Sequence, residues 1–165
     1  MSYRKRKCTA TRCGSWEKSF LASTTQSPIR LKEAARQAAQ RASHAEKNVI
    51  NVIHQDETQM ISQGADPGEL AKINMRFHAS ILAATGIPFL TESFDRLSRL
   101  LILLGVTAYT LLSRVRDITK EHQSINAAIQ SSNLEKAKEV MKIHLMHGLE
   151  ARLQLMAELN ISDLD

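Results

Sequence analysis

With 165 residues, of which 43% are hydrophobic and 24% are charged, the chain has the balance of a soluble globular protein and enough length for one domain with a core. Its formal net charge of +5 would favour nucleic-acid binding, but residues 1–30 alone carry +6 and residues 31–165 carry −1. The charge pattern therefore excludes the body of the protein as a phosphate-binding surface and leaves only the N-terminal segment for that role.

Residues 1–28 show neither helical nor strand periodicity and are rich in Ser, Thr, Lys and Arg, so we expect a basic, disordered tail. Cys8 and Cys13, the two cysteines of the chain, lie in this tail, and their spacing matches no zinc motif. We interpret them as free thiols in a reducing cytoplasm. The basic start is not followed by the apolar region of a secretory signal, which also favours a cytoplasmic protein.

From residue 29 onward, apolar side chains recur at helical spacing, and strong helix formers far outnumber the breakers Gly and Pro. The first helical stretch covers about residues 29–63, as one long helix or as two in tandem. Asp66 as N-cap with Pro67 at the first helical position starts the next helix. That helix is expected to end at the turn containing Gly86 and Pro88, because Gly suits a C-terminal cap and Pro cannot continue a helix.

Three further helices are expected in the second half of the chain. One runs from about residue 89 to residue 112 and includes the apolar run 100–112, which is too short to span a membrane. The others cover about residues 114–130 and 134–160, with Asn133 as the cap between them. The sequence thus predicts one all-α domain over residues 29–165, an antiparallel bundle of about six helices with no strand and no membrane segment.

Three of the six histidines lie on the apolar stripes of three different helices: His78, His122 and His144. A buried imidazole needs a partner, because an unsatisfied polar group costs about 1–3 kcal/mol. Three inward-facing histidines can satisfy one another by sharing a metal ion, and imidazole suits Zn, Ni, Fe or Cu. Asn74, one helical turn before His78, would offer a neutral amide oxygen as a fourth ligand. Spacing alone leaves a second interpretation open, in which the three are hydrogen-bonded core histidines.

Other candidate residues give weaker signals. His147 lies three residues after His144 but points partly away from the stripe. We expect Asp and Glu on solvated faces, and the sequence contains no phosphate-binding loop, no HExxH motif and no nucleophile elbow. These observations favour a protein that is not an enzyme. Two alternatives stay open: a small metal-dependent hydrolase or lyase on a helical bundle, and a purely structural dimerisation module.

At these residues the sequence resembles the C-terminal effector domain of GntR-type transcription regulators, the FadR-like or FCD class. Residues 74–78 (NMRFH) are similar to the family motif D/N-x-x-F-H, and residues 84–90 to its small-S/T-G-N-P-x-L turn. Residues 121–129 are similar to its E-H-x-x-I-x-x-A-I signature. His144 and Leu145 match the final H-L, 22 residues after His122. The resemblance covers roughly residues 30–155.

The resemblance implies an effector-sensing domain of a bacterial regulator that binds a divalent metal, with zinc as the first expectation and nickel or manganese as alternatives. It implies the metal ligands Asn74, His78, His122 and His144. A small organic acid would bind against the metal, helped by an arginine, for which Arg99 and its rival Arg96 are the candidates. The resemblance also implies a homodimer.

The chain departs from the family pattern in three places. Asn74 stands where many members have Asp, and Ile87 stands where Asn is usual. The third departure is the winged helix-turn-helix of the family, which needs more residues than the roughly 30 that precede the helical body. We therefore expect the sensing half of a regulator, which would contact DNA only through the missing N-terminal domain.

Overall fold

The computed structural model describes residues 30–92, 94, 95 and 108–162, and helices are the only regular elements in these ranges. The predicted all-α fold is confirmed. The tail predicted for residues 1–28 lies outside the described residues. The elements are a helix over residues 30–41, α2 (His44–Ser62), α3 (Pro67–Ala83), a helix that begins at residue 88, the short 3-10 helix η1 (Ala108–Thr110), α5 (Leu112–Gln130) and α6 (Leu134–Ser162).

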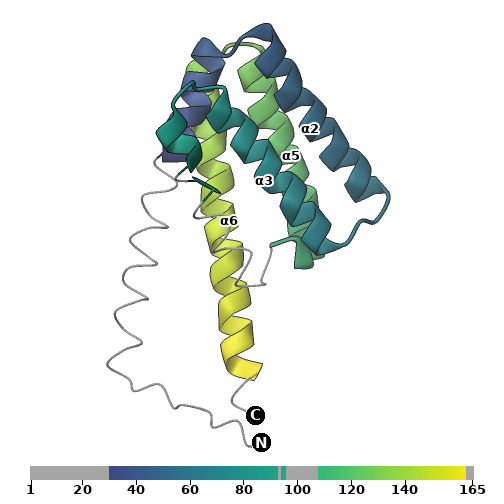
Figure 1. Cartoon of the computed structure of the whole chain (residues 1–165). Coiled ribbons are helices and arrows are strands. Elements are labelled where there is room, and N and C mark those ends of the chain that lie inside the picture. The colour runs from purple at the N-terminus through teal and green to yellow at the C-terminus, as the bar shows by residue number, and fades with distance from the viewer. Residues whose placement is uncertain (1–29, 93, 96–107, 163–165) are drawn as a thin grey trace, which may run out of the picture.

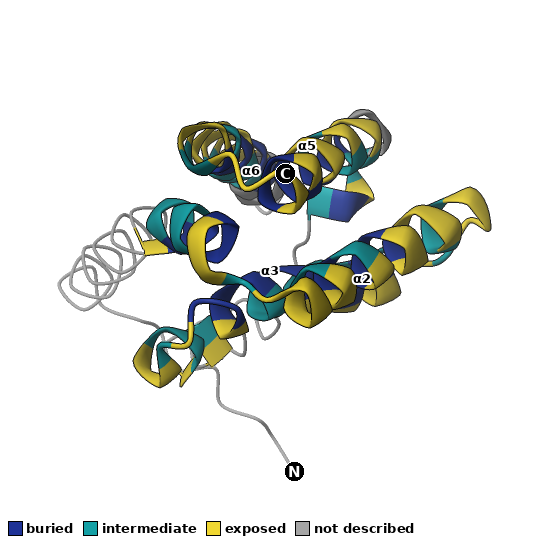
Figure 2. Ribbon diagram, turned by 90° about the horizontal axis from the view of Figure 1, so that it is seen from above, coloured by how far each residue is buried: buried dark blue, intermediate teal, exposed yellow. Residues whose placement is uncertain are grey.

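The helices pack side by side, and short turns reverse the chain between α2 and α3 and between α5 and α6 (Figure 1). α6 is the longest of the helices whose bounds are described, and it extends past the ends of α2, α3 and α5 (Figure 1). Buried residues lie toward the middle of the bundle, and exposed residues lie along its outer sides (Figure 2). None of the helices in the described ranges is long and apolar enough to cross a membrane.

Local sequence chemistry explains most of the helix boundaries. Ser43 and Glu46 form a capping box, in which each side chain accepts a hydrogen bond from the backbone N–H of the other residue. The chain therefore breaks at residues 42 and 43, and the first predicted stretch is two helices in tandem. Asp66 caps α3 as predicted, and Gly86 follows its end with a φ of +70°, which glycine adopts without strain. Asn133 caps α6 by accepting a hydrogen bond from the backbone N–H of Lys136.

The helix predicted to run on to residue 112 is wrong at its C-terminal end. Residues 108–110 form the 3-10 helix η1, Leu111 has an extended backbone, and α5 begins at Leu112. In this turn the Tyr109 hydroxyl donates a 2.6 Å hydrogen bond to Glu57, which lies 52 residues earlier in the chain. Helical periodicity contains no signal for such a long-range contact. The apolar run 100–112 lies mostly outside the described residues.

Among the described residues, two apolar clusters make up the core. The large apolar cluster joins the helix over residues 30–41 to α2, α3, α5 and α6. It contains Leu31, Ala34, Ala35, Ala38, Ala39, Ile50, Ile53, Ile73, Phe77, Ile81, Leu82, Ala84, Ile125, Ala128, Ile129, Ala137 and Met141. Its four alanines on one face of the first helix allow that helix to approach its neighbours closely. The small apolar cluster consists of Leu70, Tyr109 and Ile118. On α5, His122 lies one turn after Ile118 and one turn before Ile125, so a polar layer separates the two clusters on this helix.

Candidate metal centre

Three helices each bring one histidine to the middle of the bundle. His78 comes from α3, His122 from α5 and His144 from α6, and their exposed fractions are 5%, 0% and 6%. The Nε2 atom of His144 lies 3.2 Å from Nε2 of His78 and 3.4 Å from Nε2 of His122. The three residues can offer one ligand atom each within 4.8 Å of one another. The structure thus brings together three of the four ligands predicted from the sequence.

The helical periodicity explains this convergence. His78 directly follows the fully buried Phe77 on α3. His144 lies one turn after the buried Met141 on α6. The Phe77 ring also stacks on His122, with ring centroids 4.3 Å apart and planes 28° apart. The apolar core therefore fixes the positions of the histidines.

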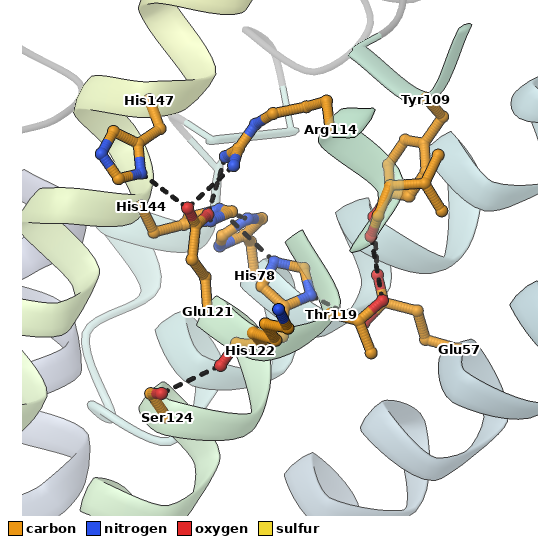
Figure 3. Close-up of polar contacts among 12 residues, drawn as sticks. Glu57, His78, Tyr109, Arg114, Thr119, Glu121, His122, Ser124, His144 and His147 are labelled. Carbon is orange, nitrogen blue, oxygen red and sulfur yellow. Dashed lines mark hydrogen bonds and ion pairs between the residues drawn. The ribbon is translucent and has the colours of Figure 1, made fainter. Parts of the chain in front are cut away.

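In two of the three histidines a carboxylate contacts Nδ1, the ring nitrogen that does not face the other histidines (Figure 3). Nδ1 of His122 lies 2.7 Å from Oε2 of Glu57, and Nδ1 of His144 lies 2.7 Å from Oε2 of Glu121. Glu57 is fully buried, and Glu121 is partly buried. By contrast, Nδ1 of His78 has no hydrogen-bond partner among the described residues. The three histidines are thus not equivalent.

Each carboxylate has a further anchor. The Tyr109 hydroxyl donates to Oε1 of Glu57 at 2.6 Å. The Arg114 guanidinium donates two hydrogen bonds to Glu121, at 2.8 and 2.7 Å, in a bidentate arrangement. His147, which is exposed on α6, has its Nδ1 2.7 Å from Oε1 of Glu121, whereas His144 contacts Oε2. Tyr109 lies in η1 and Arg114 in the first turn of α5, so neighbouring parts of the chain hold both carboxylates.

Both carboxylates are ionised in this environment. Burial pushes the pKa of Glu57 upward, but contacts with His122, His54 and Tyr109 outweigh burial and hold the pKa well below its usual range. The pKa of Glu121 is lowered in the same way, since contacts with His144 and Arg114 outweigh the effect of burial. For Tyr109, burial and the adjacent Glu57 raise the pKa, so its hydroxyl keeps the proton that it donates.

Two of the histidines are neutral near pH 7. Burial lowers the pKa of His78 well below its usual value, and the neighbouring histidines lower it further. Burial also lowers the pKa of His144 to about 4, although Glu121 partly opposes this effect. Neutral imidazole is the form that binds a metal ion.

The donor set fits a divalent transition metal. Three imidazole Nε2 atoms converge in a buried place, and tetrahedral zinc sites use such nitrogen ligands with one position left for another donor. Asn74 lies one turn before His78 on α3 and is only partly buried, and its role as a fourth ligand stays a prediction. Arg96 and Arg99, the two predicted effector-binding arginines, lie outside the described residues.

Sequence reasoning missed the residues that surround the histidines. The expectation that acidic side chains lie on solvated faces is wrong for Glu57, which is fully buried. Its position carried a signal, because Glu57 follows the buried Ile50 and Ile53 by seven and four residues on the same face of α2. Tyr109 and Arg114 had no such signal, since the periodicity did not predict the 3-10 helix at residues 108–110 or the extended backbone of Leu111.

One comparison with known proteins identifies the family of the region that contains this site. The family model of the FCD domain matches residues 32–147, which is more than half of the chain. The matched region includes the three histidines and both carboxylates. No curated protein matches the chain.

Proposed function

Because the chain belongs to the FCD domain family, a family of regulatory ligand-binding domains, we propose that it is the effector-sensing domain of a GntR-type bacterial transcription regulator. The observation that carries the proposal is the convergence of three buried histidine nitrogens inside the region that the family model matches. In an intact regulator of the cytoplasm, this domain would control DNA binding by a winged helix-turn-helix.

In this proposal His78, His122 and His144 hold a divalent metal, with Asn74 as the fourth ligand. Zinc is our first expectation, because imidazole nitrogens favour the later transition metals. Nickel and manganese stay alternatives, and manganese is the one that nitrogen ligands bind least strongly. When bound, the metal supplies a Lewis-acidic positive charge in a buried place, which favours a carboxylate as the exogenous ligand. The protein contributes neutral nitrogens in a fixed arrangement and excludes water through the surrounding apolar core.

The effector in this proposal is a small organic acid. Arg114 is a buried cation next to the histidines, but both of its terminal nitrogens already bind Glu121. Arg99 and Arg96 therefore stay our candidates for binding the effector's carboxylate. Since the three histidines come from three different helices, an acid that binds one arrangement of α3, α5 and α6 more tightly would shift the bundle toward it.

We also propose that the domain forms a homodimer. Large exposed apolar side chains that would suit an interface lie on α6, namely Ile143, Met146 and Leu153. Light scattering coupled to gel filtration should give twice the mass of the chain. A monomer at high concentration would contradict this part of the proposal.

The metal is tested by zinc binding to the full chain purified without a His-tag and stripped with a chelator. We expect one zinc per chain by calorimetry and by elemental analysis after dialysis. His78→Leu, which removes a nitrogen but keeps an apolar volume, should bind no zinc. His44→Gln is the matched control, because His44 is exposed at the start of α2. Equally low zinc in the wild type and in His78→Leu would overturn the metal proposal.

The effector class is tested on the zinc-loaded protein with acetate, succinate and citrate as probes. We expect at least one acid to raise the melting temperature of the wild type and to have no such effect on His78→Leu. The same mixtures are analysed for consumption of the acid. A thermal shift without product supports a sensor, whereas metal-dependent product formation would support the hydrolase or lyase alternative and contradict a pure sensor.

A further inference from the structure

The hydrogen-bond partner of each Nδ1 atom determines which tautomer its histidine ring adopts. A neutral imidazole carries one proton, and the nitrogen without it presents a lone pair. An ionised carboxylate can only accept, so the nitrogen of His122 that lies 2.7 Å from Glu57 must be the protonated one. The same argument applies to His144 and Glu121. In a neutral ring this leaves Nε2 with its lone pair toward the centre of the cluster, and the lone pairs of His122 and His144 then face each other at 3.4 Å, a contact that a shared cation would relieve.

We propose that Glu57 and Glu121 are positioning residues, which lock His122 and His144 in the Nδ1–H tautomer and aim their Nε2 lone pairs at a common point. The effect that this has on metal affinity rests on the proposed function, whereas the tautomers themselves do not. Ligand histidines commonly donate their second N–H to a carboxylate, which fixes the ring and raises its basicity.

The anchors explain why these carboxylates can act in this way. Glu57 accepts from Tyr109 on one oxygen and from His122 on the other, so its side chain has little rotational freedom. Glu121 is held by both terminal nitrogens of Arg114. Tyr109, Glu57 and His122 therefore form one chain of contacts, and Arg114, Glu121 and His144 form another (Figure 3). The two chains meet where the Nε2 atoms of His122 and His144 face each other.

His78 completes the arrangement in the metal-free protein. Its Nδ1 has no partner among the described residues, while its Nε2 lies 3.2 Å from Nε2 of His144. Because Nε2 of His144 carries a lone pair in our proposal, the proton of His78 belongs on Nε2, where it is donated to His144. Metal binding would then require His78, unlike the other two, to move its proton away from the centre.

The tautomers are tested by NMR of the metal-free full chain labelled with ¹⁵N-histidine, at neutral pH, through two-bond proton–nitrogen correlations. Histidine variants of each ring assign the signals. We expect the Nδ1–H tautomer for His122 and His144 and the Nε2–H tautomer for His78. A doubly protonated His122 paired with Glu57, or an Nε2–H tautomer in either of the first two rings, would overturn the proposal.

Two variants at residue 57 separate the hydrogen bond from the charge. Glu57→Gln keeps an oxygen that accepts from His122, and its amide N–H₂ can donate to the Tyr109 hydroxyl, so we expect the tautomer of His122 to persist. Glu57→Leu removes the acceptor, and we expect His122 to populate both tautomers. An unchanged His122 signal in a folded Glu57→Leu protein would contradict the proposal. If this variant does not fold, the wild-type and Glu57→Gln spectra still decide it.

Zinc affinity gives the second measurement. Glu57→Gln should weaken zinc binding by about tenfold, and Glu57→Leu by up to about a hundredfold, as is typical when the partner of a ligand histidine is lost. Glu69→Gln is the matched control, because Glu69 is exposed on α3, and its affinity should equal that of the wild type. If Glu57→Gln and Glu57→Leu bound zinc as tightly as the wild type and Glu69→Gln do, the positioning role of Glu57 would be overturned. Absence of zinc binding in the wild type would overturn the proposed function instead, and the NMR result would stand on its own.

Discussion

The large apolar cluster and the three-histidine centre occupy the same helices, one turn apart, and differ in what burial does for them. On α5, His122 lies one turn before the buried Ile125, and on α6, His144 lies one turn after the buried Met141. In the large apolar cluster, every apolar surface that is removed from water stabilises the folded state. The histidine centre contains two anions and three imidazoles, whose transfer from water is unfavourable unless each finds a partner.

This difference shows what each region contributes. Replacing a buried ionic pair by apolar residues is often neutral or stabilising, so the polar centre is not explained by stability alone. The hydrogen bonds from Glu57 and Glu121 instead fix the orientation of His122 and His144. We infer that the large apolar cluster stabilises the fold, and that the histidine centre adds to the free energy of unfolding only when a ligand binds to it.

The largest expected effect comes from Phe77, which belongs to the apolar cluster and stacks on His122. Phe77→Ala should lower the free energy of unfolding by about 3–5 kcal/mol, because it removes buried surface and leaves a cavity. Urea denaturation of the metal-free protein measures this loss. Phe77→Leu keeps more of the volume and should lose less. A loss below about 1 kcal/mol for Phe77→Ala would contradict the assignment of stability to this cluster.

The next effect is confined to the histidine centre. Free zinc at one hundred times its dissociation constant should stabilise the wild type by about 2.7 kcal/mol, since a ligand that binds only the folded state stabilises it by mass action. His78→Leu should lose this stabilisation entirely. Ile129→Val, in the apolar cluster, should lower the starting stability by about 0.5–1.5 kcal/mol and keep the zinc effect. Thermal unfolding with and without zinc measures both.

The sequence predicted the parts of the fold that rest on local chemistry. Asp66 and Asn133 were identified as caps, because a capping side chain acts within three residues of itself. His78, His122 and His144 were identified because helical periodicity places them on buried faces. Tyr109 was not identified, because its position depends on a hydrogen bond to Glu57, 52 residues away.

Acidification should destabilise the metal-free protein through the histidine centre. The pKa of His144 is about 4 in the folded protein, against 6.5 for an exposed histidine, and the pKa of His78 is shifted in the same direction. Between pH 6.5 and about 4 the unfolded chain therefore binds more protons, and stability falls as the pH is lowered. The slope should reach about 1.4 kcal/mol per pH unit for each such histidine.

Urea midpoints measured across this pH range test the prediction, and His144→Leu should flatten the dependence because one of the titrating groups is gone. Below pH 4.5 protonation of Glu57 and Glu121, whose pKa values are lowered in the folded state, should add a further loss. A wild-type stability that stays constant from pH 7 to pH 5 would show that these imidazoles are not held neutral by burial.

The smallest effect is expected for an ion pair on the outer side of α3. Lys72 and Glu69 are in contact, and the pair raises the pKa of Lys72, but both side chains are exposed. Water and salt compete with such a pair, so Lys72→Gln should leave the urea midpoint unchanged within error. The Glu57–His122 hydrogen bond is similarly short but is shielded from water by burial. A clear fall in the urea midpoint of Lys72→Gln would show instead that close contact stabilises the Lys72–Glu69 pair even where water competes with it.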